Sequence, residues 1–449
     1  MNLSVRKLLI SMAFAVFAVC ETAQAGVAGH GAAATRGAET GPGVIMTQAA
    51  QETEAETAAA ETSVAAETAA AEETAAAQVT EAAQETAAAQ VTETAQETSA
   101  AQETSAAQEA AATQGTLTMI AAGDNLVHEY VYKNAWNAET GTYDFIPMYE
   151  CIRDLIRSRD LAVVNQETIF VSDNALISTF PAFGTPMSMG EAVVDTGFDI
   201  VLSATNHTWD KGLRGVSDTL TYWKTCHPEI RLLGIHESPE AFNTIDYVEK
   251  NGIRLAMFNY TYGLNGFSLP AGQPYLVNLL AYKDKFLQDV RTAESQADMT
   301  VCFLHIGEEY HYAPTAFQRA YVTELVDAGA DLVICAHPHV VEPVEELTTA
   351  AGNHALVYWS LGNFLASQTR TDTILGGLAD VTITKDAAGT RVTAYDFIPT
   401  VIHFSGPIER VMPLDMYTDE LAAVHHVNLS QPGLTVAKLR TLWHSITGR

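Results

Sequence analysis

The sequence predicts an α/β layered sandwich that follows a long segment with no fold of its own. From Thr116 onward, short apolar runs alternate with stretches of helical spacing, which is the order of elements in α/β proteins. Polar residues follow several of these runs directly. Open α/β sheets place their sites in the loops at the carboxyl ends of strands. The same pattern therefore predicts where the functional residues lie.

The first twenty-five residues are typical of an export signal. Arg6 and Lys7 supply positive charge, the apolar run 8–20 follows, and Ala23-Gln24-Ala25 forms a small-residue cleavage site. A membrane-spanning helix needs about 20 apolar residues, and this run is shorter. We therefore predict that residues 1–25 are a signal peptide.

The composition of residues 26–115 predicts a disordered low-complexity linker. After residue 47 the segment consists almost entirely of Ala, Glu, Thr, Gln and Ser, without an aromatic side chain. Glutamine recurs every six residues from Gln78 to Gln114, a period that keeps no constant face on a helix. Fourteen Glu stand against one Arg, so like charges should extend the segment. We interpret it as a tether between the cell surface and a folded domain.

The remaining residues are enough for one large α/β domain or two small ones, and we predict one domain over residues 116–449. The whole chain carries a net charge of −30, which argues against nucleic acid and against anionic membrane surfaces as partners. The cysteines that follow the predicted signal peptide are Cys151, Cys226, Cys302 and Cys335, and no two of them form a CxxC motif. We expect buried free thiols rather than disulfides.

Within this domain the apolar pattern predicts the elements in order. Buried strands are predicted for residues 117–122, 161–164, 199–204, 253–259, 299–305, 331–335 and 356–360. Helices are predicted for residues 146–158, 189–197, 216–226, 280–294 and 315–328, the second of them ending at a glycine. Residues 373–411 alternate apolar and polar side chains, as antiparallel strands with one exposed face do.

Five loops after predicted strands carry polar residues suited to chemistry. They contain Asp124 with His128, Asn165 with Glu167, Asn206 with His207 and Asp210, His305 with Glu308 and Glu309, and His337 with His339. Singly, each has an ordinary explanation, because aspartate caps helices, asparagine forms turns and a strand histidine is often a core residue. Together they favour a shared site, because a sheet gathers its strand ends along one edge.

The mixture of imidazole, carboxylate and amide groups points to a metal site. Such donors suit Zn, Mn or Fe, whereas an all-oxygen cage would suggest Ca or Mg. The donors are too many for one tetrahedral zinc and fit two ions about 3.5–4 Å apart with a bridging carboxylate. Such a pair activates water and stabilises charge on oxygen, so we predict hydrolysis or transfer at a phosphorus or acyl centre. A histidine beside an asparagine ligand, as in Asn206-His207, suits protonation of a leaving group.

Six motifs in order along the chain resemble those of the CapA family of bacterial capsule-synthesis proteins. They are Gly123-Asp124, Asn165-Gln166-Glu167, ATNHTWDKG at 204–212, HIGEEY at 305–310, AHPHV at 336–340 and YWSLGNF at 358–364. The resemblance covers most of residues 116–399. That family is associated with poly-γ-glutamate and is similar to the calcineurin-like metallophosphoesterases, which implies an αββα layered sandwich.

The resemblance also implies roles for single residues. It implies two divalent ions (Mn, Fe or Zn), a bridging Glu167, a catalytic acid at His207, and metal ligands at Asp124, Glu167, Asn206, His305, His337 and His339. We add His128 to the first ion's ligands, because the Asp-x-His sequence usual in phosphoesterases is absent here. Thr205 and Ile306 depart from the family's motifs and Trp359 is inserted, but no proposed ligand is lost.

Two functions from different classes remain. The first is a secreted, surface-tethered hydrolase or transferase of capsule or poly-γ-glutamate synthesis. Its partners would be a cell-envelope polymer or the carrier of that polymer, and a membrane capsule-synthesis complex. The second is a non-catalytic capsule assembly or anchoring protein that keeps a structural metal site. The intact ligand set together with His207 favours the enzyme.

The export signal predicts an extracellular or cell-surface location. Lipid attachment at Cys20 is a less favoured alternative, because Val19 stands where a lipidation signal has a small residue.

Overall fold

The structure is a computed structural model, and it describes residues 114–449. The predicted signal peptide, Cys20 and nearly all of the predicted linker lie outside the described residues. The first strand, β1, begins at Gly115, within one residue of the predicted start of the domain.

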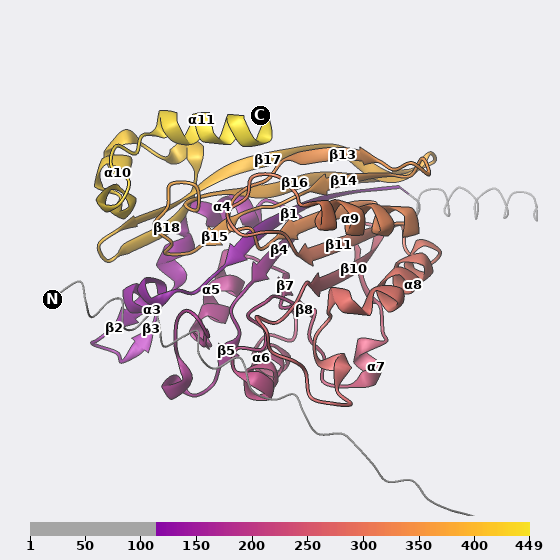
Figure 1. The fold of residues 1–449 in the computed structure, drawn as a ribbon, viewed down its shortest axis with the longest axis horizontal. Coiled ribbons are helices and arrows are strands. Elements are labelled where there is room, and N and C mark those ends of the chain that lie inside the picture. Colours follow the sequence, from indigo (N-terminus) through magenta and orange to yellow (C-terminus); the bar gives the residue numbers. More distant parts are fainter. Residues whose placement is uncertain (1–113) are drawn as a thin grey trace, which may run out of the picture. The chain divides into compact units, whose positions relative to one another are not determined.

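Two sheets form the centre of the fold (Figure 1). The eight-stranded sheet has the order β18-β17-β16-β1-β4-β7-β8, with β15 paired to β1. Its strands are β1 (Gly115–Asn125), β4 (Leu161–Gln166), β7 (Ile200–Leu202), β8 (Arg231–Leu233), β15 (Asn363–Leu365), β16 (Leu375–Asp386), β17 (Gly389–Ser405) and β18 (Ile408–Pro413). β1, β4, β7 and β8 run parallel, whereas β16, β17 and β18 pair antiparallel.

The six-stranded sheet has the order β13-β14-β12-β11-β10-β9. Its strands are β9 (Asp246–Lys250), β10 (Ile253–Thr261), β11 (Met299–His305), β12 (Leu332–Ala336), β13 (Val344–Thr348) and β14 (His354–Tyr358). β10, β11, β12 and β14 run parallel, and β9 and β13 are antiparallel edges. Parallel strands covered on both faces are continuous apolar runs, which is why the sequence revealed them.

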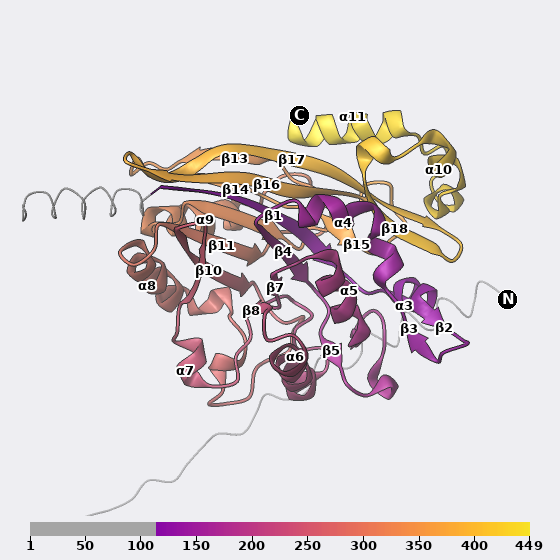
Figure 2. The same cartoon turned by 180° about the vertical axis from the view of Figure 1, so that it is seen from behind.

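Helices cover the outer faces of both sheets (Figures 1 and 2). The eight-stranded sheet carries α3 (Glu129–Ala135), α4 (Glu150–Arg157), α5 (Ser188–Thr196) and α6 (Gly212–Cys226), and the six-stranded sheet carries α8 (Lys283–Glu294) and α9 (Ala316–Ala328). Along β1, Met119 and Ala121 face the other sheet while Ile120 and Ala122 face the helices, as strand alternation requires. These four layers confirm the predicted αββα sandwich.

Most predicted elements are present with shifted ends. β11 has the predicted bounds, and α5 ends at Thr196 and is capped by Gly197, whose φ of 102° is left-handed. The predicted helix 146–158 divides into a 3-10 turn, η1 (Ile146–Tyr149), and α4; likewise η4 (Leu280–Tyr282) precedes α8. The region predicted as antiparallel strands forms β16 to β18.

Several short elements had no periodic signal in the sequence. They are β2 (Trp136–Asn137), β3 (Thr142–Tyr143), β5 (Phe170–Val171), β6 (Thr185–Pro186), α7 (Pro239–Phe242), α10 (Asp419–Val424), η2 (Asn174–Leu176), η3 (Pro274–Leu276), η5 (Leu414–Met416) and η6 (His426–Leu429). A further helix, α11 (Val436–Thr447), was also missed and buries Leu439 and Trp443.

The cysteines in the described part of the chain are free thiols, as predicted. Cys302 and Cys335 are buried in β11 and β12, and Cys151 is half-buried. The prediction of burial is wrong for Cys226, which is exposed because it is the last residue of α6. No helix of residues 114–449 has the length and apolar character needed to cross a lipid bilayer.

Candidate metal centre

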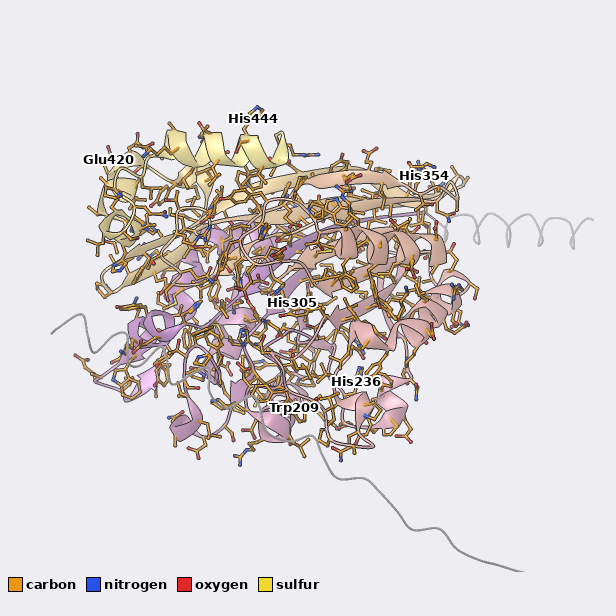
Figure 3. All side chains as sticks on the ribbon, in the orientation of Figure 1. Trp209, His236, His305, His354, Glu420 and His444 are labelled. Carbon is orange, nitrogen blue, oxygen red and sulfur yellow. The ribbon has the colours of Figure 1, made fainter. Side chains whose placement is uncertain are left out.

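The predicted site residues meet where the carboxyl ends of both sheets come together. Asp124 lies at the end of β1 and Glu167 follows β4, in the eight-stranded sheet. His305 ends β11 and His337 follows β12, in the six-stranded sheet; Figure 3 shows His305 near the middle of the ribbon. The expectation of a single sheet edge is corrected, since the later parallel strands form a second sheet.

Asp124, Glu167 and His339 form a first group of donor atoms. His339 Nδ1 lies 3.2 Å from Asp124 Oδ2 and 3.8 Å from Glu167 Oε2. One donor atom from each residue lies within 4.8 Å of the other two. An ion about 2.0–2.2 Å from each nitrogen and oxygen would fit between such atoms.

Glu167 also belongs to a second group, with His305 and His337. His305 Nε2 lies 3.6 Å from Glu167 Oε1 and 2.9 Å from Asn206 Oδ1. The ring centres of His305 and His337 are 4.9 Å apart. Glu167 directs one oxygen to each group, which is the position of a carboxylate that bridges two ions. The structure therefore gathers around one space the six side chains Asp124, Glu167, Asn206, His305, His337 and His339.

Buried atoms without partners show that these residues fit a cation. Glu167 is 1% exposed, and neither of its oxygens has a hydrogen-bond partner among the described residues. His337 Nδ1 is buried in the same condition. Burying polar atoms without partners destabilises a fold. A divalent ion would satisfy these atoms, and the mixed nitrogen and oxygen donors suit Mn, Fe or Zn.

The charges of the site are strongly coupled. Burial would raise the pKa of the Glu167 carboxyl, but His339 and His305 outweigh it and hold that pKa below its ordinary value. Burial would lower the pKa of His339, but Glu167 and Asp124 raise it to about 9. The pKa of His337 is lowered, first by burial and then by His305. Histidine binds a metal only when neutral, so a cation would displace a proton from His339 but none from His337.

An unusual backbone turns both histidines of the His-Pro-His loop into the site. His337 has a φ of 107° and His339 a φ of 60°, in a region that side chains other than glycine rarely adopt. The His337 N–H donates to Asp124 Oδ2 at 3.2 Å, and the Pro338 carbonyl accepts from the Tyr310 N–H at 2.8 Å. The contact with Asp124 holds the strained loop against a strand end of the other sheet, and the contact with Tyr310 holds it against the loop after β11 of its own sheet.

His207, the predicted catalytic acid, is held by a carboxylate. Its Nδ1 lies 2.7 Å from Asp210 Oδ2, and the ring packs edge-on against Phe183 with centres 4.6 Å apart. Asp210 also accepts from the Phe183 N–H at 2.7 Å. A carboxylate on Nδ1 fixes the ring and its tautomer, which leaves Nε2 for a substrate.

His128 lies beside the two groups of donor atoms and not within them. It is half-buried, its Nδ1 has no partner among the described residues, and its ring packs edge-on against Phe183 at 5.3 Å. Burial, and then His339, lower the pKa of His128 to about 4. Its ring is therefore neutral at neutral pH, as a ligand must be. Its place in the first ion's shell stays a prediction.

Two asparagines that were not among the predicted ligands complete the site. Asn165 Nδ2 donates to Asp124 Oδ1 at 2.7 Å and lies 3.2 Å from His305 Nδ1. Asn363 Oδ1 lies 3.0 Å from His339 Nδ1. Both residues belong to motifs that were recognised in the sequence. Their place in these motifs, near the end of β4 for Asn165 and at the start of β15 for Asn363, was the signal that could have identified them as site residues.

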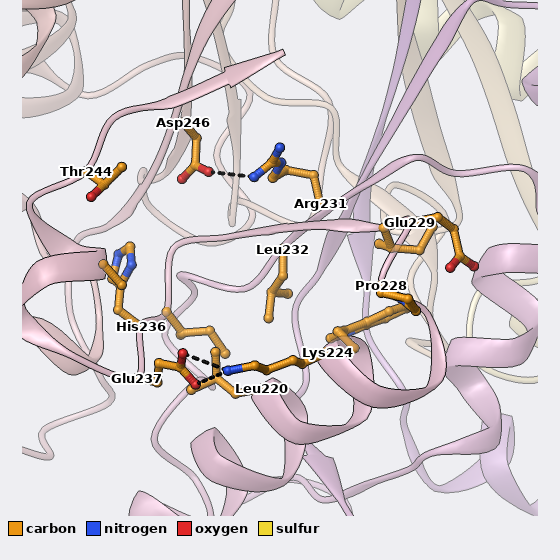
Figure 4. A pocket seen from close by; sticks show the side chains of 14 residues that line it. Leu220, Lys224, Pro228, Glu229, Arg231, Leu232, His236, Glu237, Thr244 and Asp246 are labelled. Carbon is orange, nitrogen blue, oxygen red and sulfur yellow. Dashed lines mark hydrogen bonds and ion pairs between the residues drawn. The ribbon is translucent and has the colours of Figure 1, made fainter. Parts of the chain in front are cut away.

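A separate cavity lies elsewhere, between α6, β8 and β9 (Figure 4). Its volume is about 520 Å³. Arg231 Nη1 is 3.5 Å from Asp246 Oδ1, and Lys224 Nζ is 2.8 Å from Glu237 Oε1. None of the groups of metal-binding side chains found in residues 114–449 lies in this cavity, whereas Glu167 and His337 belong to such a group and have unpaired atoms. We therefore place the functional site at the strand ends.

Solved structures with a similar fold have low sequence identity to this chain. The calcineurin-like phosphoesterase YfkN from Bacillus subtilis is 13% identical with a TM-score of 0.39, over 73% of this chain and 99% of that chain. A phosphatase from Mycoplasma pneumoniae is 14% identical with a TM-score of 0.38, over 64% of this chain and 94% of that chain. Similarities at this level carry no conclusion about activity.

Two curated relatives are closer in sequence. The PGA biosynthesis protein CapA of Bacillus subtilis (strain 168) is 31% identical over 214 residues, which are 47% of this chain and 53% of that protein. The capsule biosynthesis protein CapA of Bacillus anthracis is 30% identical over 188 residues, which are 41% of this chain and 44% of that protein. The chain thus spans about half the length of the curated relatives it matches.

A family model described as "Bacterial capsule synthesis protein PGA_cap" matches residues 118–368. The match begins in β1 and ends just after β15, so it spans every strand end that contributes to the candidate metal centre. It covers more than half of the chain, and it confirms the resemblance that the six motifs predicted. The chain belongs to the bacterial capsule synthesis protein PGA_cap family.

Proposed function

We propose that this protein is a metal-dependent hydrolase or transferase that uses two divalent ions between its two sheets. The bond acted on would be a phosphoester, or a γ-glutamyl amide of a capsule polymer such as poly-γ-glutamate. Both curated relatives are named for capsule or PGA biosynthesis, and we place this chain in the same process.

The arrangement around Glu167 carries the proposal. Its two buried oxygens face two different groups of donors, and each group has three residues. A structural zinc site closes its coordination with four protein ligands, whereas a catalytic site has three and keeps a position open. Asn206 would add a fourth donor to the second group, and two Mn or Fe ions that prefer more than four ligands would still have open positions for water and for a substrate oxygen.

The protein's own residues would handle the protons. When bound, the ions would supply an activated water and stabilise charge on the attacking and leaving oxygens. His207, fixed through Nδ1 by Asp210 at 2.7 Å, would hold a proton on Nε2 and give it to the leaving group. Phe183 packs on the rings of both His207 and His128, so it would limit the access of water on that side.

The place of action is also a proposal. A signal peptide over residues 1–25 would export the protein, and residues 26–115 would tether the domain at the cell surface. The substrate would then be a cell-envelope polymer or its carrier, and a membrane capsule-synthesis complex would be the partner. The family's association with capsule synthesis supports this location.

Metal analysis followed by a substrate screen tests the proposal. The purified protein, loaded with Mn, Fe or Zn, would be assayed on p-nitrophenyl phosphate, bis(p-nitrophenyl) phosphate and γ-glutamyl p-nitroanilide. We expect turnover of at least one substrate that disappears in His337→Ala together with the metal. A metal-loaded protein that turns over none of them would favour the alternative, a non-catalytic assembly or anchoring protein with a structural metal site.

A further inference from the structure

An arginine beside the candidate metal centre is held in one position. Arg370 lies in the loop between β15 and β16, and its guanidinium carbon is 4.6 Å from the centre of the Tyr310 ring. The Tyr310 ring centre is in turn 6.1 Å from that of His339. A single aromatic ring therefore separates this positive charge from a predicted metal ligand, and cation–π attraction holds the charge there.

Hydrogen bonds connect Tyr310, the ring beneath Arg370, to the candidate metal centre. Asn363, whose Oδ1 lies 3.0 Å from His339 Nδ1, donates through Nδ2 to Gln368 Oε1 at 2.9 Å. Gln368 Nε2 lies 3.4 Å from the Tyr310 hydroxyl oxygen, to which it donates. The distance between His339 and Tyr310 is therefore fixed by direct contacts rather than by the loop alone.

The guanidinium is oriented as well as placed. Its Nε donates to Asp372 Oδ1 at 2.9 Å and its Nη2 donates to Asp372 Oδ2. Asp372 also accepts from the Tyr312 hydroxyl at 2.7 Å. The Arg370 side chain is 46% exposed, and its Nη1 has no hydrogen bond to a described residue. One side of the planar group is thus fixed and the other is free for a ligand.

The C-terminal segment ties down the loop that carries the arginine. The N–H and hydroxyl of Thr371 donate to Gln431 Oε1 at 2.7 and 2.8 Å. The Ser430 hydroxyl donates to the Thr369 carbonyl at 3.0 Å. Because the loop is already ordered, a ligand that binds Arg370 loses less conformational entropy on binding.

The charge of the surroundings explains what such a cation would do. The chain carries a net charge of −30, and one loop of the site contains Glu308 and Glu309. Bound ions would attract an anionic substrate at the reacting bond, but a second negative group further along the substrate would meet these carboxylates. A fixed guanidinium near this second negative group would offset its repulsion by the carboxylates and would add a charged hydrogen bond.

We propose that Arg370 binds a negatively charged group of the substrate away from the reacting bond, a carboxylate or a phosphate. Arg370 would thereby give the site its preference for substrates with more than one negative group. This inference rests on the proposed hydrolase or transferase function.

The test uses three p-nitrophenyl alkyl phosphates that differ only at the end of the alkyl chain, which carries a carboxylate, a phosphate or a methyl ester. In Arg370→Gln we expect kcat/KM to fall about 10–100-fold for the two anionic substrates, mainly through KM. The value for the methyl ester should be unchanged. Whichever anionic substrate loses more identifies the group that Arg370 binds.

Two further variants control the result. Arg370→Gln with Asp372→Asn removes both charges. It should show the same loss of preference if the cause is the missing cation and not the Asp372 carboxylate left without a partner. Arg319→Gln is the matched control, because Arg319 also lies over an aromatic ring, that of Trp359 at 4.7 Å, and pairs with Glu345 at 3.0 Å. It should leave all three substrates unaffected.

Equal losses on all three substrates, or no loss on the anionic ones, would overturn the assignment of Arg370. If the metal-loaded wild type turns over none of these three phosphodiesters, the phosphoester form of the proposed function fails, and binding still tests the arginine. Calorimetry would then compare non-hydrolysable phosphonate analogues of the three compounds. Weaker binding of the anionic analogues to Arg370→Gln would support the assignment, and equal binding to both proteins would overturn it.

Discussion

Removal of the metal should destabilise the fold, and the geometry of the site sets the magnitude. Both oxygens of Glu167 and Nδ1 of His337 are buried without a hydrogen-bond partner among the described residues. Each unsatisfied buried atom costs about 1–3 kcal/mol, so the three together correspond to about 3–9 kcal/mol. Water that enters the metal-free site would recover part of this, so we expect a loss of about 3–6 kcal/mol.

Differential scanning calorimetry measures this loss as a change in melting temperature. For a domain of this size each kcal/mol corresponds to about 2–4 °C, so dialysis against EDTA should lower Tm by roughly 6–24 °C. Reloading with Mn, Fe or Zn should restore it, with bound metal followed by mass spectrometry. His337→Ala should melt near the metal-free temperature and no longer respond to EDTA. His227→Ala is the control, because His227 lies away from the site, where its Nε2 is 3.0 Å from Glu191 Oε1. This variant should respond to EDTA like the wild type.

Equal melting temperatures for metal-loaded and metal-free protein would refute this reasoning, provided that the loaded sample contains metal. Such a result would mean that binding of the ion to the unpaired atoms of Glu167 does not raise the free energy of unfolding. The bridging position of Glu167 would then have to be abandoned.

Three further predictions concern residues of different regions. His207→Ala should keep its metal and lower turnover by about 10²–10⁴-fold; an unchanged rate in the metal-loaded variant would remove His207 from the mechanism. Burial raises the pKa of Glu409 on β18 from 4.5 to about 8, so the folded state keeps a proton that the unfolded chain releases, and stability should fall as pH rises between these values. Glu409→Gln should abolish that fall and be more stable by about 2–4 kcal/mol at pH 8 in urea unfolding; identical pH profiles for the two proteins would contradict this. Deleting residues 26–113 should leave Tm nearly unchanged, because the aromatic-free repeat has no apolar face to bury; a drop of many degrees would show that it packs on the domain.

Much of the fold could be predicted because strands buried on both faces of a sheet appear in the sequence as continuous apolar runs. β11 was predicted with its observed bounds, since a central parallel strand is apolar along its whole length. The end of α5 could be predicted because the left-handed position that caps this helix favours glycine, here Gly197. Short elements such as α7 and α10 were missed, because four to six residues are too few to show a period.

Exposure was harder to predict than position along the chain. Cys226 was expected to be buried, yet it is exposed at the end of α6. Arg370 had no signal at all, because its contacts with Tyr310 and Asp372 depend on a loop that is held by Gln431. Such contacts join distant segments, and no local pattern encodes them.

The sequence by itself determined the fold class, the strand ends that carry polar side chains and the residue types of the candidate metal centre. Asp124, Glu167 and His305 each follow or end an apolar run, and that information is local. Only the tertiary structure decided that these residues belong to two sheets and that Glu167 stands between two groups of donors. The physical reason is that strand periodicity specifies which side chains are buried, whereas the stacking of two sheets specifies which buried side chains meet.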